Sequence, residues 1–129
     1  MTFAIHGGGD AHPPRVAIVD LDRRVQQSVA DVLRVAGLEV VGTAGDVRSA
    51  LELIEATRPE VVIIDPRLPE VSAGSALLSS IGLAWPTMRV VLMGWADGAE
   101  PALADRRTFV SKSAQPEEFV AAALAACTC

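Results

Sequence analysis

Short apolar runs alternate with longer amphipathic segments along most of this chain. The runs are six or seven residues long and lie at 15–20, 38–44, 60–65, 88–94 and 107–112; the first four are rich in Val, Ile and Leu, and the last is centred on Phe109 and Val110. Runs of this length and composition are typical of buried β-strands. The run EVVIID at 60–65 is the most apolar, so we expect it near the centre of a sheet.

The segments between the runs have the spacing of helices. At 23–36 the apolar positions Val25, Val29, Val32, Leu33 and Ala36 share one face, Asp22 can cap the start and Gly37 can end the helix. Further helices are predicted from Asp46 to just before Pro59, at 72–82 and at 115–126, and the segment 101–105 leaves room only for a short one. Five strands alternating with five helices predict an α/β fold, a doubly wound parallel sheet covered on both faces.

The length of 129 residues suits a single domain. We predict a mobile leader at 1–14 that holds His6 and His12, one domain at 15–126 and a short tail at 127–129 that holds Cys127 and Cys129. The net charge is −5 and no basic run occurs, which argues against nucleic-acid binding. No apolar run approaches a membrane span of ~20 residues, and the N-terminus lacks the pattern of a secretory signal, so a cytoplasmic location is expected.

Three polar residues interrupt the apolar runs at their carboxyl ends. Asp20 ends the first predicted strand, Asp65 ends the third and Lys112 closes the fifth. The carboxyl ends of parallel strands meet at one rim of a sheet, which is where ligands bind in such folds. The sequence therefore predicts that these three side chains form one polar site.

The constellation resembles the receiver domain of bacterial two-component response regulators. The resemblance covers about 15–126 and rests on IVDLD, VVIIDPRLP, VVLMG and FVSKSAQPEEF. It implies a flavodoxin-like sheet of order 2-1-3-4-5 and a role in signal transduction. It also implies that Asp65 accepts a phosphoryl group from a histidine kinase, that Lys112 pairs with this group, and that the aromatic residue Phe109 changes rotamer on activation.

The resemblance further implies a Mg²⁺ site made by Asp20, Asp65 and the backbone carbonyl of Arg67. The family's second acidic residue directly follows the first, and this position is Leu21, which cannot bind a metal. The family's Ser or Thr at the end of the fourth strand is matched here to Met93, whose thioether donates no hydrogen bond. Met93 is then a core residue, and we expect Mg²⁺ binding to be weak.

The segment between Met93 and Phe109 is about three residues shorter than is usual in the family. It leaves barely two turns for a fourth helix between Asp97 and Asp105. A shortened helix predicts an unusually apolar surface near Trp95, Leu103 and Phe109. We expect this surface to bind a protein partner, or to form a homodimer through the fourth helix, fifth strand and last helix.

The main interpretation is an atypical, non-enzymatic receiver that signals by protein docking and has a degraded phosphorylation site. The first alternative is a receiver that is still weakly phosphorylated on Asp65 by a histidine kinase. In the main interpretation Asp65 is a structural relic and Lys112 neutralises the two aspartates. The second alternative is a haloacid-dehalogenase-like phosphatase, with Asp20 as nucleophile and Asp22 as acid/base, which the pattern VDLD allows.

Overall fold

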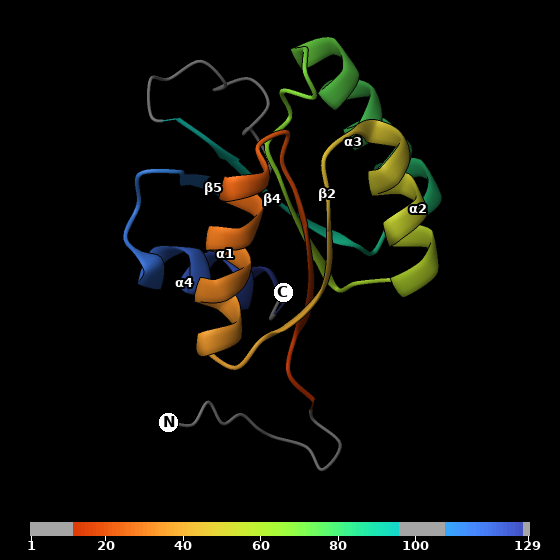
Figure 1. The fold of residues 1–129 in the computed structure, drawn as a ribbon. Helices are drawn as coiled ribbons and strands as arrows, with labels where there is room; N and C mark the ends of the chain where they lie inside the picture. Colours follow the sequence, from red (N-terminus) through yellow and green to blue (C-terminus); the bar gives the residue numbers. More distant parts are fainter. Residues whose placement is uncertain (1–11, 96–107, 128–129) are drawn as a thin grey trace.

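The computed structural model describes residues 12–95 and 108–127 (Figure 1). Within these ranges the elements are, in chain order, β1 (Arg15–Val19), α1 (Arg23–Val35), β2 (Glu39–Ala44), α2 (Val47–Thr57), β3 (Val61–Ile64), α3 (Val71–Ala84), β4 (Arg89–Gly94), β5 (Thr108–Ser111) and α4 (Pro116–Cys127). The short helix expected between Asp97 and Asp105 lies outside the described residues. No helix in the described part is long and apolar enough to span a membrane.

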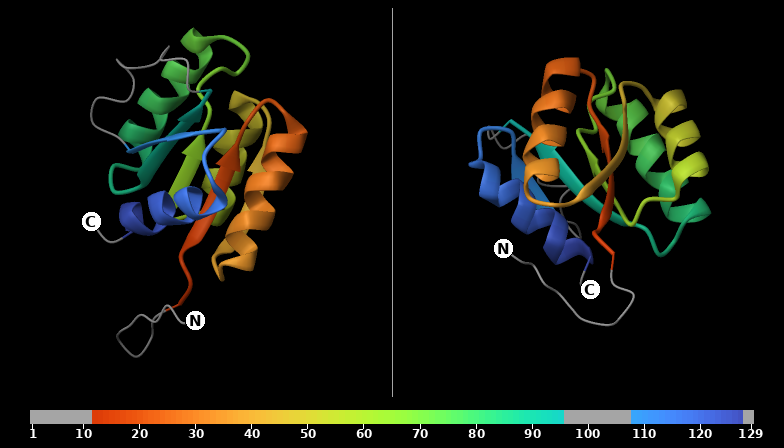
Figure 2. Two further views of the ribbon diagram at one scale, coloured as in Figure 1. Left: turned by 90° about the vertical axis from the view of Figure 1, so that its left-hand side faces the viewer. Right: turned by 60° about the horizontal axis from the view of Figure 1, so that its bottom comes forward.

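The five strands form one sheet of order β2-β1-β3-β4-β5, and every neighbouring pair is parallel. This confirms the predicted order 2-1-3-4-5. Figures 1 and 2 show α1 and α4 on one face of the sheet and α2 and α3 on the other. The chain thus places all five carboxyl ends of the strands at one rim.

The sheet separates two apolar layers because side chains alternate along each strand. Ile18 and Ile63 face the layer beneath α1 and α4, whereas Val19 and Ile64 face the layer beneath α2 and α3. All four side chains are fully buried. β3 is buried at every position, as its sequence and central place predict.

The helix ends follow from their capping residues. The Asp22 carboxylate accepts a hydrogen bond from the Arg24 amide at the start of α1, and Asp46 forms a capping box with Ser49 at the start of α2. Gly37 follows α1 with a φ of 95°, a conformation that favours glycine. α4 continues to Cys127, one residue beyond the helix end predicted at Ala126.

The loop after β3 lies tightly against the first turn of α3. A Cβ atom added to Gly74 would stand 1.6 Å from the carbonyl oxygen of Pro66. Leu68, from the same loop, is buried in the layer beneath α2 and α3. The absence of a side chain at Gly74 therefore sets how closely α3 approaches the residues that follow Asp65.

Candidate functional site

Asp20, Asp65 and Lys112 each lie one residue beyond a strand and are anchored there by the main chain. The amide of Asp20 donates to the carbonyl of Ala44, and that of Asp65 donates to the carbonyl of Val19. The Lys112 amide donates to the carbonyl of Gly94 at 2.8 Å. Each acceptor is the last residue of a neighbouring strand, so hydrogen bonds of the sheet fix the backbone positions of the three residues.

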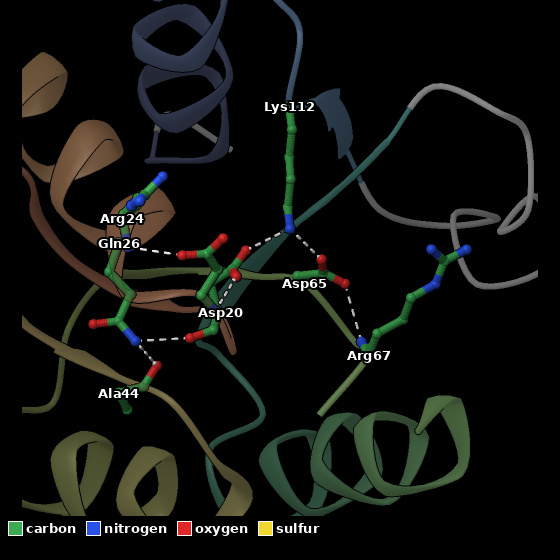
Figure 3. Close-up of polar contacts among 8 residues, drawn as sticks. Asp20, Arg24, Gln26, Ala44, Asp65, Arg67 and Lys112 are labelled. Carbon is green, nitrogen blue, oxygen red and sulfur yellow. Dashed lines mark hydrogen bonds and ion pairs between the residues drawn. The ribbon is translucent and has the colours of Figure 1, made fainter. Parts of the chain in front are cut away.

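The three side chains meet, as the sequence predicts (Figure 3). Lys112 Nζ lies 2.7 Å from Asp20 Oδ2 and 2.5 Å from Asp65 Oδ2. The side chains of Asp20, Asp65 and Lys112 are 2%, 10% and 7% exposed, so the ion pairs are shielded from solvent. We call these three residues the triad.

The second oxygen of each carboxylate is held by the main chain. Asp20 Oδ1 accepts from the Asp22 amide at 2.7 Å, and Asp65 Oδ1 accepts from the Arg67 amide at 3.0 Å. Each carboxylate therefore contacts one backbone N–H and the lysine ammonium. Hydrogen bonds to a charged acceptor are stronger than those between neutral groups, so both aspartates are firmly oriented.

The charge of Lys112 is set by two opposing effects. Burial alone would lower its pKa, because it disfavours the charged form. Hydrogen bonds and Coulombic attraction from Asp20 and Asp65 outweigh burial and raise the pKa above its usual 10.5. Lys112 is thus a permanent cation within the triad at neutral pH.

Gln26 supports the triad and was missed in the sequence. Its Nε2 donates to the backbone carbonyl of Asp20 at 2.7 Å and to that of Ala44 at 3.2 Å, which joins the ends of β1 and β2 (Figure 3). Gln26 is buried on the same face of α1 as Val29 and Leu33. The buried face of α1 is therefore rotated slightly from the face predicted through Val25 and Val32. The presence of the polar residue Gln26 on this mainly apolar face was the only sequence feature that could have indicated its role.

Replacing Gln26 by leucine is expected to lower the free energy of unfolding by about 1–3 kcal/mol. The change removes the donor to the Asp20 carbonyl, whereas the Ala44 carbonyl keeps the hydrogen bond from the Asp20 amide, and a buried polar group that loses its partner is costly. Urea unfolding followed by circular dichroism measures the change. Gln27→Leu is the matched control because Gln27 is exposed on the same helix; equal effects of the two substitutions would contradict the assignment.

The residues that depart from the receiver pattern occupy different environments. Leu21 is 56% exposed beside the triad and offers no oxygen ligand. Met93 is fully buried in the layer beneath α1 and α4, in agreement with a core role. β4 ends at Gly94 rather than at Met93, and neither residue carries a hydroxyl group. Phe109 is 38% exposed on β5.

The triad does not fit a Mg²⁺ ion as it stands. Mg²⁺ prefers near-octahedral oxygen ligands and gives up its waters reluctantly. Among residues 12–95 and 108–127, no group of three or more His, Cys, Asp or Glu side chains is placed to hold a metal. The two carboxylates that remain are already engaged by Lys112 and by backbone amides.

Trp95 is a further neighbour of the triad that sequence reasoning did not place there. Lys112 Nζ lies 5.5 Å from the centroid of the Trp95 ring, within the range of a cation–π interaction. Trp95 follows β4 directly and is 51% exposed. The tryptophan was expected only as part of an apolar surface, because its distance to Lys112 depends on the pairing of β4 with β5.

Comparison with known proteins agrees with this geometry. The sequence model of the response regulator receiver domain matches residues 16–124. The receiver domain of NtrX from Brucella abortus superposes with a TM-score of 0.79 at 29% identity, covering 88% of this chain and 98% of that one. The signal receiver domain of NarL from Mycobacterium tuberculosis gives a TM-score of 0.73 at 28% identity, covering 92% and 98%.

Curated relatives share the same region. The transcriptional regulatory protein PdtaR of Mycobacterium tuberculosis is 41% identical over 59 residues, which are 46% of this chain and 29% of PdtaR. The protein-glutamate methylesterase/protein-glutamine glutaminase 5 of Anaeromyxobacter dehalogenans is 37% identical over 101 residues, or 76% of this chain and 28% of that protein. The chain thus spans less than a third of the length of these relatives. The fold and the family model over residues 16–124 agree, and the chain belongs to the response-regulator receiver domain family of two-component signalling.

Proposed function

We propose that this receiver keeps its phosphorylation site closed with its own lysine and signals mainly by docking to a protein partner. The observation that carries the proposal is the double engagement of Lys112, which pairs with both Asp20 and Asp65. Leu21 adds no third ligand, and no hydroxyl group stands at Met93 or Gly94. The domain itself is proposed to have no enzymatic activity.

Charge supports the closed state. Transfer of a phosphoryl group to a carboxylate places additional negative charge beside Asp65, which a metal ion normally offsets. Lys112 supplies one positive charge, and this charge already balances buried carboxylates. A Mg²⁺ ion would have to displace the lysine or share two carboxylates with it, so its binding is expected to be weak.

Weak phosphorylation of Asp65 is the second candidate function. Asp65 keeps its place at the rim beside Lys112, and its side chain is 10% exposed. A histidine kinase would then be a partner of this domain. The phosphatase alternative has little support, because Asp22 caps α1 and holds Asp20 through its amide instead of facing a substrate site.

Exposed apolar residues support docking at the β4–β5 side of the domain. Trp95 and Phe109 are 51% and 38% exposed, and Leu103, the third residue expected on this surface, lies outside the described residues. The partner is proposed to be another protein or a second copy of this chain. Sedimentation at rising concentration distinguishes the two, and Trp95→Ala should weaken either association.

The closed site is tested with Mg²⁺ and beryllofluoride. We expect the unmodified protein to bind Mg²⁺ weakly and to show little response to beryllofluoride or acetyl phosphate in amide NMR spectra. Leu21→Asp should restore Mg²⁺ binding, because it adds a carboxylate beside Asp20. Leu21→Asn is the matched control, since it is similar in size but carries no charge.

The conformational response should stay incomplete in Leu21→Asp. A hydroxyl group is still absent at the end of β4, and Met93→Thr and Gly94→Thr test the two positions at which one could be restored. Tight, Mg²⁺-dependent binding of beryllofluoride by the unmodified protein would overturn the proposal in favour of an ordinary phosphorylated receiver.

A further inference from the structure

The Lys112 ammonium is enclosed by the two carboxylates and one aromatic ring. Asp20 and Asp65 hold it by charge, and the ring of Trp95 lies 5.5 Å from the nitrogen. The face of an indole ring carries partial negative charge and attracts an ammonium ion without itself requiring a counterion. Trp95 therefore favours the same position of the lysine that the carboxylates favour.

The position of Trp95 is tied to the triad through the backbone. Trp95 directly follows Gly94, whose carbonyl accepts the hydrogen bond from the Lys112 amide. The ring and the lysine both line a groove of about 310 Å³ between α1 and α4, together with Val25, Val29 and other residues. Because Trp95 is half exposed, its ring can turn away without opening the apolar core.

We propose that Trp95 is a positioning residue that holds the Lys112 ammonium against Asp20 and Asp65 and thereby weakens Mg²⁺ binding at these carboxylates. This inference deepens the proposed function and rests on it. With the ring in place, the ammonium is attracted by the ring in addition to the two carboxylates. With the ring displaced, the lysine can leave, and the carboxylate oxygens become available to a divalent cation.

The contact is tested first without any metal. In the unmodified protein, the ring current of Trp95 should shift the NMR signals of the Lys112 ε-methylene protons. Trp95→Leu should abolish this shift and, through the lost attraction, speed exchange of the Nζ protons with water by roughly 2- to 30-fold. Trp95→Phe keeps an aromatic face and should retain much of both effects, which an apolar packing role alone would not explain.

Mg²⁺ affinity is measured next, in a Leu21→Asp background where binding is strong enough to follow. Adding Trp95→Leu should tighten Mg²⁺ binding by roughly 2- to 30-fold, and adding Trp95→Phe should change it less. Trp85→Leu is the matched control. Trp85 lies 5.9 Å from the Arg58 guanidinium at the opposite end of the sheet, so its loss should leave Lys112 and Mg²⁺ binding unchanged.

Two results would overturn the inference. One is a set of Lys112 ε-methylene signals that is identical in the unmodified protein and in Trp95→Leu. The other is an equal Mg²⁺ affinity with and without Trp95 in the Leu21→Asp background. Neither depends on whether the unmodified protein is phosphorylated, so failure of the inference is distinguishable from failure of the proposed function.

Discussion

Replacing Lys112 by methionine is expected to lower the free energy of unfolding by about 3–5 kcal/mol. Methionine has a similar length but removes the only cation that the structure places between Asp20 and Asp65 among the described residues. Two buried carboxylates then face each other without compensation. For a domain of this size the loss corresponds to a fall in Tm on the order of 10–20 °C, which scanning calorimetry measures directly.

Three comparisons separate this effect from a general loss of charge. Arg48→Met is the matched control, because Arg48 pairs with Glu52 at 3.6 Å in an exposed position and should cost less than about 1 kcal/mol. Adding Asp65→Asn to Lys112→Met should recover part of the loss by removing one of the unpaired charges. Mg²⁺ should stabilise Lys112→Met more than the unmodified protein, since a ligand that binds only the folded state stabilises it. Equal stability of Lys112→Met and the unmodified protein would contradict the triad.

Because of the same ion pairs, the free energy of unfolding should depend on pH in the alkaline range. The pKa of Lys112 is raised in the folded state, so the folded state binds this proton more tightly than the unfolded chain does. The contribution is complete below about pH 10.5 and is lost as the pH rises through the higher folded-state value. Lys112→Met should remove this part of the alkaline loss of stability.

Gly74→Ala is expected to destabilise the protein by about 3 kcal/mol or more. The new Cβ atom would lie 1.6 Å from the Pro66 oxygen and 2.4 Å from its carbonyl carbon, both of them backbone atoms that cannot turn aside. The cost of inserting one methyl group into a packed region is typically 1–3 kcal/mol, and a collision with backbone lies at or beyond the upper end. Chemical unfolding gives the magnitude, and NMR shifts of Asp65 show whether the loop beside the triad moves.

Gly82→Ala in the same helix is the matched control. Nothing lies within 4 Å of a Cβ atom added at Gly82, so alanine should stabilise α3 by roughly 0.5–1 kcal/mol through its higher helix propensity. The two substitutions add the same atoms and are expected to have opposite signs. A destabilisation at Gly82 as large as that at Gly74 would show that α3 does not tolerate alanine for reasons other than the contact with Pro66.

The sheet could be predicted because its strands are buried. β1 and β3 are fully apolar along their buried positions, and each is followed directly by an aspartate that is itself buried beside Lys112. A parallel sheet brings the carboxyl ends of its strands to one rim, so Asp20, Asp65 and Lys112 could be predicted to share a site. Capping by Asp22 could also be predicted, because it depends on residues close together in the sequence.

The remaining features depend on contacts between distant segments. Gln26 is one amide on a mainly apolar helix, and its role follows only from the carbonyl groups that β1 and β2 bring beneath it. The contact of Trp95 with Lys112 requires the register of β4 against β5. The same register shows that Gly94, and not Met93, ends β4, a difference of one residue that reverses the face of the sheet.

The cation in this site is the Lys112 ammonium, which is covalently part of the chain, so its occupancy does not depend on the concentration of any dissolved ion. A dissolved ion leaves a site when its concentration falls, whereas a tethered ammonium keeps a local concentration that dilution cannot reduce. The triad is also buried, so added salt screens it far less than it screens exposed pairs such as Arg48 with Glu52. The resting state of this receiver should therefore remain the same over wide changes in ionic strength and in the concentration of divalent ions. A change of state should then require the binding of a partner protein.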